Sequence, residues 1–381
     1  MPGEITATET MVESAILVGV QLKSERVKRD MERSLLELAQ LASTAGIDVV
    51  GKLTQQLEKL SATHYLGSGK LQELAELKHE LQYNVVICDG ELSPRQQRNL
   101  EDALEVKVID RTALILGVFA KHAQTREGRL QIELAQHEYL LPRLKGQWSH
   151  LERLGGGIGT RGPGESQLET DRRLIQQKIG RLKKEIEQVR KHRNLYRQRR
   201  KNSGIPIISL VGYTNAGKST LLNALTKADV LVEDKLFATL DPVTRRLHLF
   251  DQQQVLLTDT VGFIHRLPPM LIEAFKATLE EIEEADLLLH VVDVSHPDAV
   301  HQYNTVEKMI YDLGFTSKPK LIVLNKVDLL VEEQELAEEA TLSLYPEFRS
   351  IEEQVVLISA AKGWCLNTLL HRISEVVSTT S

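Results

Sequence analysis

The sequence has little of what marks a secreted, disulfide-linked or membrane protein. Its 381 residues include only two cysteines, Cys88 and Cys365, which lie far apart and have no cysteine or histidine neighbours at metal-ligand spacing. No stretch approaches the roughly 18 apolar residues that span a bilayer, and Glu4, Glu9 and Glu13 lie where a secretory signal would be basic and then apolar. These absences predict a cytoplasmic protein with no membrane span and no disulfide framework.

Charge is distributed unevenly along the chain. The net charge is −6, but residues 202–381 hold 14 Lys and Arg against 26 Asp and Glu, while residues 1–201 hold 33 against 27. Residues 171–201 carry most of the basic excess, with 13 basic and 3 acidic side chains. A short basic segment next to an acidic region indicates a polyanionic partner that is contacted in one place.

Hydrophobic patterning predicts an α/β protein in three parts. Residues 1–123 alternate short apolar runs with helical patterns, which is typical of a small domain with a parallel sheet. Residues 124–203 predict a long antiparallel two-helix arm around a Gly-rich loop at 155–164. Residues 204–381 show five apolar strands separated by helical patterns, which predict a doubly wound, mostly parallel sheet. The strands and helices expected in the first part are 15–20, 29–44, 85–88, 94–104 and 106–109, and the arm helices are roughly 127–145 and 166–200.

A phosphate-binding loop follows the apolar run 205–211. The pattern G-x-x-x-x-G-K-[ST] is formed by Gly212, Tyr213, Thr214, Asn215, Ala216, Gly217, Lys218 and Ser219, and a helical pattern continues from Thr220. Glycines let main-chain N–H groups close around phosphate oxygens, and the helix N-terminus adds a positive dipole. We expect Lys218 to reach the β- and γ-phosphates and Ser219 to offer its hydroxyl to Mg²⁺.

Two further segments complete the predicted phosphate site. Asp259 is expected to hold Mg²⁺ through water, and the N–H of Gly262 to sense the γ-phosphate. A threonine between these motifs should contact Mg²⁺ and the γ-phosphate and release both after hydrolysis. We choose Thr239, with Thr244 as the alternative and an ordinary turn threonine as the remaining interpretation. The two segments are Asp259, Thr260, Val261 and Gly262, and Phe237, Ala238, Thr239, Leu240 and Asp241. The predicted Mg²⁺ ligands are Ser219, Thr239 and Asp259, and the predicted catalytic residues are Lys218, Thr239 and Gly262.

The base of the nucleotide is predicted from two later motifs. Asn325, Lys326, Val327 and Asp328 follow the apolar run 321–324. A carboxylate at Asp328 can accept hydrogen bonds from guanine N1–H and the 2-amino group, a pattern that adenine does not offer. Ser359, Ala360 and Ala361 follow the run 355–358 and would place a main-chain N–H near guanine O6. The order of motifs predicts a P-loop GTPase that binds GTP and GDP with Mg²⁺ and hydrolyses GTP.

One position departs from the pattern of Ras-like proteins. Those proteins place a glutamine directly after Asp-x-x-Gly, where it orients the attacking water. This chain has Phe263 there, which cannot do so. We therefore expect slow intrinsic hydrolysis that a partner accelerates.

The middle segment carries a further distinctive stretch of sequence. Residues 155–173, GGGIGTRGPGESQLETDRR, together with the nucleotide motifs, resemble the HflX family of GTPases, translation factors that bind the ribosome. Residues 65–70 and 89–94 are similar to that family's N-terminal motifs. The resemblance covers nearly the whole chain and implies binding to the large ribosomal subunit and its RNA, with GTP-controlled splitting of stalled or idle ribosomes. The chain ends at Ser381, so we expect no contact from the additional C-terminal domain of some members.

RNA contacts are predicted in two places. In the Gly-rich loop, glycines permit close backbone approach and arginines meet phosphate, although a plain flexible hairpin remains an alternative. Its G-x-G-x-x-G at 157–162 is not a dinucleotide site, because Pro163 follows and no strand precedes it. The basic run 190–201 is the second place, with a merely solvated helix face as its alternative. The residues predicted are Arg153, Gly157, Gly159, Arg161, Gly162, Arg193, Arg197, Arg199 and Arg200.

Three functional hypotheses follow. The first is a GTPase that binds the large subunit and splits ribosomes. The second is a ribosome-assembly or RNA-binding protein in which GTP gates binding without splitting. The third is a signalling GTPase unrelated to RNA. We expect a monomer, since no long self-complementary apolar seam is present.

Overall fold

The structure is a computed structural model that describes residues 13–23, 28–144, 163–202, 204–226, 235–250, 253–268, 270–271, 276–348 and 354–380. It contains two compact units, Met1–Val118 with Gln136–Ile179, and Phe119–Ala135 with Gly180–Ser381. The division falls within three helices, α4 (Arg111–His122), α5 (Arg126–Leu140) and α8 (Pro163–Asn202). The three-part division at residues 123 and 203 therefore stays a prediction.

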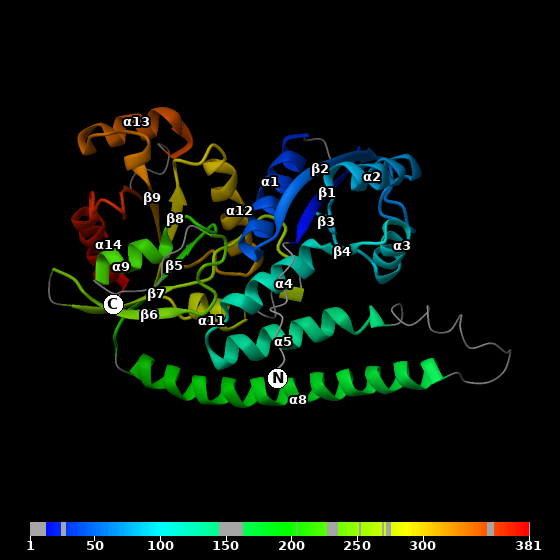
Figure 1. Ribbon diagram of the computed structural model, residues 1–381. Coiled ribbons are helices and arrows are strands. Elements are labelled where there is room, and N and C mark those ends of the chain that lie inside the picture. The colour runs from blue at the N-terminus through cyan, green and yellow to red at the C-terminus, as the bar shows by residue number, and fades with distance from the viewer. Residues whose placement is uncertain are drawn as a thin grey trace, which may run out of the picture. The chain divides into compact units, whose positions relative to one another are not determined.

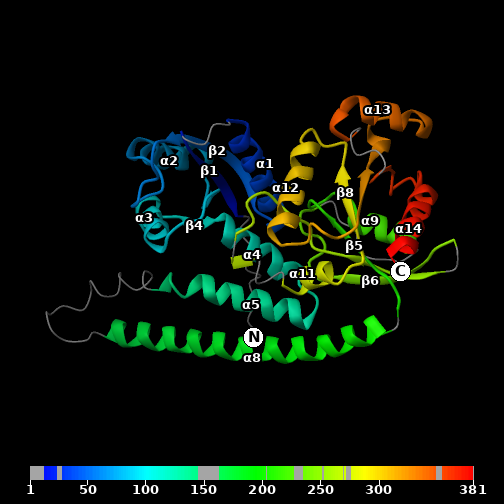
Figure 2. The same cartoon turned by 180° about the vertical axis from the view of Figure 1, so that it is seen from behind.

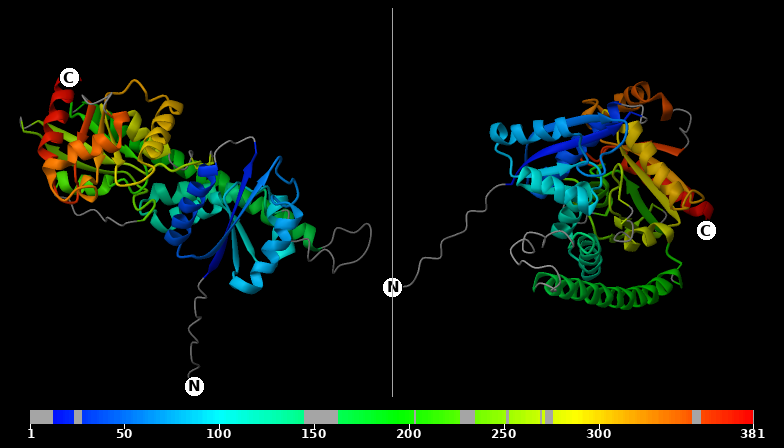
Figure 3. Two further views of the ribbon diagram at one scale, coloured as in Figure 1. Left: turned by 90° about the horizontal axis from the view of Figure 1, so that it is seen from above. Right: turned by 90° about the vertical axis from the view of Figure 1, so that its right-hand side faces the viewer.

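The first unit is built on a parallel four-stranded sheet of order β2-β1-β3-β4. The strands are β1 (Ser14–Leu22), β2 (Asp48–Leu57), β3 (Val85–Cys88) and β4 (Lys107–Asp110), and the helices between them are α1 (Lys28–Ala45), α2 (Ser68–Leu81) and α3 (Pro94–Leu104). Along β1, Ile16 and Val18 pack with Leu74 of α2 and Leu100 of α3. Gly19 faces the other side, because a Cβ there would meet Leu35 of α1. Helices therefore cover both faces, as the left panel of Figure 3 shows.

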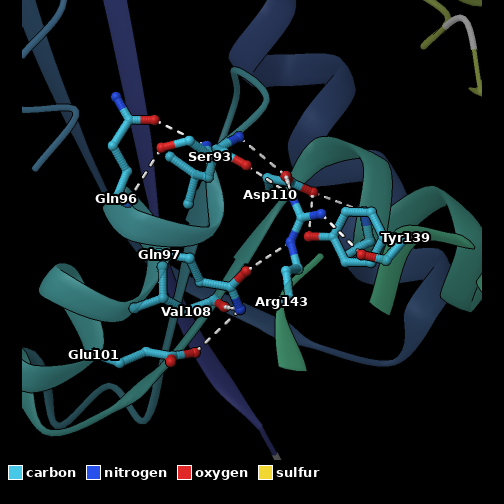
Figure 4. Close-up of polar contacts among 10 residues, drawn as sticks. Ser93, Gln96, Gln97, Glu101, Val108, Asp110, Tyr139 and Arg143 are labelled. Atoms are coloured by element: carbon cyan, nitrogen blue, oxygen red, sulfur yellow. Dashed lines mark hydrogen bonds and ion pairs between the residues drawn. The ribbon is translucent and has the colours of Figure 1, made fainter. Parts of the chain in front are cut away.

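A polar network lies at the carboxyl end of β4 (Figure 4). The buried carboxylate of Asp110 accepts from the Tyr139 hydroxyl at 3.0 Å and from the Arg143 guanidinium at 3.2 Å. Arg143 also donates to Gln97 of α3 at 3.0 Å and stacks over the Tyr139 ring at 3.5 Å. Asp110 is thus both paired and hydrogen-bonded, which is the usual condition for a buried charge. This network ties the end of α5 to the first sheet.

The second unit is built on a six-stranded sheet of order β10-β9-β8-β5-β7-β6, in which only the β6–β7 pair is antiparallel. Its strands are β5 (Ile207–Gly212), β6 (Val243–His248), β7 (Gln254–Asp259), β8 (Leu287–Asp293), β9 (Lys320–Asn325) and β10 (Val355–Leu357). Its helices include α9 (Lys218–Thr226), α11 (Lys276–Glu283), α12 (Ala299–Asp312), α13 (Ala337–Leu344) and α14 (Leu366–Thr380). This is the doubly wound, mostly parallel sheet that the sequence predicts, with one strand more than the five expected.

The central strands of this sheet, β5, β8 and β9, are buried on both faces. On β8, Leu289 packs with Leu221 of α9 and Ile373 of α14, while Leu288 packs with Val306 of α12. Figures 1 and 2 show α9 and α14 on one side of the strands and α12 on the other. Burial of both faces explains the near-continuous apolar runs by which these strands are predicted. A parallel sheet of this kind collects its loops and their polar side chains at the carboxyl ends of its strands.

Helix α8 has 40 residues. The right panel of Figure 3 shows it as one unbroken helix. Within the second unit, its Arg193 pairs with Glu127 of α5 at 3.0 Å and its Glu185 lies 3.9 Å from Arg126. On this helix Leu182 is buried, whereas Leu174 is exposed. Among the described residues, no helix is both long enough and apolar enough to cross a membrane.

Candidate nucleotide site

The loop after β5 has the conformation that phosphate binding requires. Gly217 has a φ of +90°, and a Cβ there would collide with the side-chain amide of Asn325. Lys218 follows at the start of α9 and is buried, and its Nζ donates to the carbonyl oxygens of Tyr213 at 2.8 Å and Gly212 at 3.2 Å. The ammonium therefore lies inside the loop, where it would meet phosphate oxygens. Burial lowers the pKa of Lys218 from 10.5 to about 8, and the Asp259 carboxylate opposes this shift.

Three oxygen-bearing side chains meet beside the loop. The Ser219 hydroxyl donates to Asp259 Oδ2 at 2.6 Å and lies 2.7 Å from the Thr239 hydroxyl. Burial raises the pKa of Asp259, although Lys218 and the two hydroxyls favour its ionised form. Its second oxygen, Oδ1, is buried and accepts no hydrogen bond from the residues that the structure describes. A carboxylate and two hydroxyls with an unsatisfied oxygen fit a hard cation such as Mg²⁺.

The choice of Thr239 over Thr244 agrees with this geometry. Thr244 lies on β6, and its hydroxyl is 2.9 Å from that of Thr258 on β7, within the sheet. Thr239 precedes β6 and is held against the loop by Ser219. Its roles in catalysis and metal binding stay predictions.

The Asp-x-x-Gly segment packs directly on the phosphate loop. A Cβ at Gly262 would meet the Cα of Thr214, so this close approach needs a glycine. The next residue, Phe263, accepts a main-chain hydrogen bond from Thr214 at 2.8 Å and donates one to Gly212 at 3.1 Å. Its ring is buried in a core cluster with Ile282 and cannot orient water. Thr260 donates its hydroxyl to the carbonyl oxygen of Leu210 on β5 at 2.6 Å.

The base-recognition motifs are joined through one amide. Asn325 donates from Nδ2 to the carbonyl oxygen of Ala216 at 2.9 Å and accepts at Oδ1 from the N–H of Ala360 at 3.0 Å. The contact of residues 359–361 with guanine O6 stays a prediction. Lys326, with a φ of +66°, pairs with Asp293 at 2.7 Å.

Asp328 and Ser359 complete this end of the site. Asp328 Oδ1 is buried and has no hydrogen-bond partner within the described part of the chain, so a donor from a ligand would satisfy it. Ser359 accepts at Oγ from the N–H of Lys362 at 3.0 Å, which shapes its loop. Val327, the residue before Asp328, is buried in a core cluster.

The structure gathers most of the predicted phosphate-site residues into one pocket. The pocket is lined by Thr214, Asn215, Gly217, Lys218, Ser219, Thr220, Lys235, Phe237, Ala238, Thr239, Thr260 and Gly262. Lys235 is the one lining residue that the motifs do not predict. The predicted residues Tyr213, Ala216, Leu240 and Val261 are buried behind this surface. Asp241 is not part of the lining; its carboxylate accepts hydrogen bonds from the N–H groups of Gln124 and Thr125, both at 2.8 Å.

Most of the residues predicted to contact RNA lie outside the part of the chain that the structure describes. Arg153, Gly157, Gly159, Arg161 and Gly162 lie outside the described residues, as do the side chains of Arg197, Arg199 and Arg200. Arg193 is described and only 17% exposed, and its guanidinium pairs with Glu127 and Glu280. As an RNA contact it stays a prediction, although these pairs already use its guanidinium within the second unit.

Sequence reasoning missed two contacts of the switch segments. Tyr213 accepts a hydrogen bond at its hydroxyl from the N–H of His265 at 2.8 Å, which links the phosphate loop to the segment after Gly262. Asp241 reaches Thr125, 116 positions away along the chain. Thr125 could have been identified as a helix N-cap by its residue type, but nothing local indicates the carboxylate that it meets.

Comparison with known proteins agrees with this site. Residues 32–120 match the family described as GTP-binding GTPase N-terminal, residues 122–200 match GTP-binding GTPase Middle Region, and residues 207–326 match 50S ribosome-binding GTPase. The GTPase HflX of Caldanaerobacter subterraneus subsp. tengcongensis is 55% identical over 318 residues, 84% of this chain and 73% of the relative. The chain belongs to the HflX family of GTPases.

Other relatives agree with this assignment. The GTPase HflX of Escherichia coli K12 is 46% identical over 318 residues, which cover 84% of this chain and 74% of that one. A crystal structure of the protein SsGBP in complex with GDP is 25% identical, covers 97% of this chain and 99% of that one, and has a TM-score of 0.50. This HflX family member is a GTPase. The predicted fold class, GTP and GDP binding and GTP hydrolysis are confirmed.

Proposed function

We propose that this HflX family member uses GTP to control binding to the large ribosomal subunit and that its GTP state splits stalled or idle ribosomes. The observation that carries the proposal is the contact between Ser219 and Thr239, which holds the switch segment against the phosphate loop. Because Thr239 is held at the γ-phosphate position through its hydroxyl, its contacts there can form with GTP and be released with GDP. The match of residues 207–326 to a 50S ribosome-binding GTPase family supports the ribosome as the partner.

We further propose that Mg²⁺ binds at Ser219, Thr239 and Asp259. The cation would satisfy the buried Asp259 Oδ1 and neutralise charge on the β- and γ-phosphates. Among the described residues, no cluster of three or more His, Cys, Asp and Glu forms a metal site elsewhere. The protein acts in the cytoplasm, where ribosomes are, and as a monomer.

The second candidate is a ribosome-assembly or RNA-binding GTPase that binds without splitting. The basic residues of 171–201 support RNA contact in either case. Binding through these side chains would weaken steeply as salt rises, because phosphate contacts release counterions. A signalling GTPase unrelated to RNA would show no such dependence.

Density-gradient sedimentation of purified ribosomes tests these alternatives. We expect a non-hydrolysable GTP analogue to convert whole ribosomes to subunits, with the protein on the large one, and GDP not to do so. Thr239→Ala should bind GDP but not split ribosomes, while Thr244→Ala is the matched control, because the Thr244 hydroxyl lies 2.9 Å from that of Thr258 within the sheet. Large-subunit binding that leaves whole ribosomes intact would favour the assembly alternative. No co-sedimentation at low salt in either nucleotide state would exclude both.

A further inference from the structure

The switch segment is attached to the rest of the second unit on both sides of Thr239. Before it, Phe237 is 2% exposed and packs edge-to-face on Phe119 of α4, with ring centroids 4.6 Å apart. After it, the Asp241 carboxylate binds the turn between α4 and α5. Phe237 has a φ of +60°, a conformation that a bulky residue keeps only when its surroundings hold it. Thr239 thus lies between two residues, Phe237 and Asp241, that are both held by the end of α4 and the turn after it.

The Asp241 carboxylate caps helix α5. Its Oδ2 accepts from the N–H groups of Gln124 and Thr125, and its Oδ1 accepts from the Thr125 hydroxyl at 2.5 Å. The same hydroxyl accepts from the N–H of Gly128 at 2.9 Å, so Thr125 is the N-cap of α5 and uses its proton for Asp241. A carboxylate is favoured at a helix N-terminus, where unpaired N–H groups and the helix dipole are positive.

The contact between Asp241 and the start of α5 requires a glycine at position 128. A Cβ at position 128 would collide with Asp241 Oδ1, so a larger residue would displace the carboxylate. Glycine in the first turn of a helix is otherwise unfavourable relative to alanine. Glycine at position 128 therefore favours the helix less than alanine would, but it leaves space for the Asp241 carboxylate.

The first turn of α5 also contacts helix α8. Glu127, in the first turn of α5, pairs with Arg193 of α8 at 3.0 Å, and Arg193 also pairs with Glu280 of α11. Arg190 of α8 lies 3.4 Å from Glu280. Movement at the N-terminus of α5 would therefore change what α8 contacts in this unit.

We propose that Asp241, Thr125 and Gly128 form a latch that positions Thr239 for GTP and that transmits the nucleotide state to helices α5 and α8. The proposal rests on the nucleotide contact of Thr239 given under the proposed function. GTP orders the switch segment and closes the latch; GDP releases Thr239 and frees Asp241 from the helix. By linkage, breaking the latch lowers the affinity for GTP relative to the affinity for GDP.

The ratio of affinities for a non-hydrolysable GTP analogue and for GDP, measured with fluorescent nucleotides on the full-length protein, tests the latch. Asp241→Asn and Gly128→Ala should each lower this ratio about tenfold, a typical size for coupling between two sites. Gly180→Ala is the matched control, because Gly180 is an exposed helical glycine with no neighbour that a Cβ would meet. Gly128→Ala should not lower the unfolding temperature, which separates loss of the latch from loss of the fold.

Hydrogen exchange at the amides of residues 124–128 gives a second readout. The wild type should protect these amides more with the GTP analogue than with GDP, and Asp241→Asn should remove the difference. Affinity ratios within twofold of wild type for both variants, with unchanged exchange, would overturn the latch. Thr239→Ala separates the two proposals: a normal ratio in that variant refutes the nucleotide role of Thr239, while a lowered ratio with normal Asp241→Asn and Gly128→Ala refutes the latch alone.

Discussion

The side-chain amide of Asn325 donates to the main-chain carbonyl of Ala216 at 2.9 Å, across 109 positions of sequence. Its side-chain oxygen, Oδ1, accepts a hydrogen bond from the N–H of Ala360 at 3.0 Å. One buried side chain thus fixes the phosphate loop relative to the loop that would contact guanine O6. The geometry of the site depends on this amide before any nucleotide arrives.

Asn325→Ala should weaken both GTP and GDP binding by at least tenfold. The substitution leaves the Ala216 carbonyl and the Ala360 N–H without their partner, at about 1–3 kcal/mol for each buried group. Asn84→Ala is the matched control, since Asn84 accepts from the N–H of Ser14 in the first unit. Equilibrium binding of a fluorescent nucleotide and thermal unfolding should show both variants less stable but only Asn325→Ala impaired in binding. Equal nucleotide affinities for the two would contradict this prediction.

Asp328→Asn should transfer the specificity from guanine to xanthine nucleotides. The carboxylate pairs with two donors of guanine, whereas xanthine carries an oxygen in place of the 2-amino group and needs a donor from the protein. A site built on hydrogen bonds rejects a mismatched partner strongly, because a buried group is left unpaired. Competition of GDP and xanthosine diphosphate for wild type and variant measures the change. If the variant's affinities for GDP and for xanthosine diphosphate fell equally, Asp328 would have a structural role and no role in recognising the base.

Much of the first and second sheets follows from local pattern. Helix α3 begins where expected because Pro94 occupies its first turn and Ser93 and Gln96 form a reciprocal capping box. The apolar run at β3 is buried at every position, so its composition alone indicates a strand.

The strands that the sequence did not reveal are edge strands. β6, with Arg245 and Arg246 exposed, and β2, with a largely polar sequence, each lie at the end of a sheet. An edge strand pairs with one neighbour only and can leave polar side chains exposed, so the composition of these two strands resembles that of a loop, unlike that of the edge strands β4 and β10. The latch of Asp241 on Thr125 was hidden for a related reason, since a contact over 116 positions leaves no local pattern.

Phe263→Leu should change single-turnover GTP hydrolysis by less than about threefold, because the ring packs in the core rather than toward the phosphates. Phe263→Gln should not accelerate hydrolysis either. It would bury an amide in an apolar cluster and destabilise the fold by about 2–5 kcal/mol, as loss of a large core side chain does. Quenched single-turnover assays without ribosomes, beside urea denaturation, measure both effects. A large acceleration by glutamine would mean that this side chain can reach the attacking water.

Lys218 should make the nucleotide-free protein more stable as pH rises from about 8 toward 10.5. Burial lowers the pKa of Lys218 to about 8, with Asp259 opposing, while the unfolded chain keeps the ordinary value of 10.5. Between these values the unfolded state binds more protons than the folded state, so the free energy of unfolding increases with pH by up to about 1 kcal/mol per unit. Lys218→Met removes the ionisable group and should flatten the difference between pH 8 and 10 in urea denaturation. Nucleotide phosphates favour the charged ammonium, so GDP binding near pH 8.5 should take up a proton in the wild type. Lys218→Met should take up less. Calorimetry in two buffers of different ionisation enthalpy measures this proton uptake. Proton release on binding would show that the ammonium is not desolvated in the empty loop.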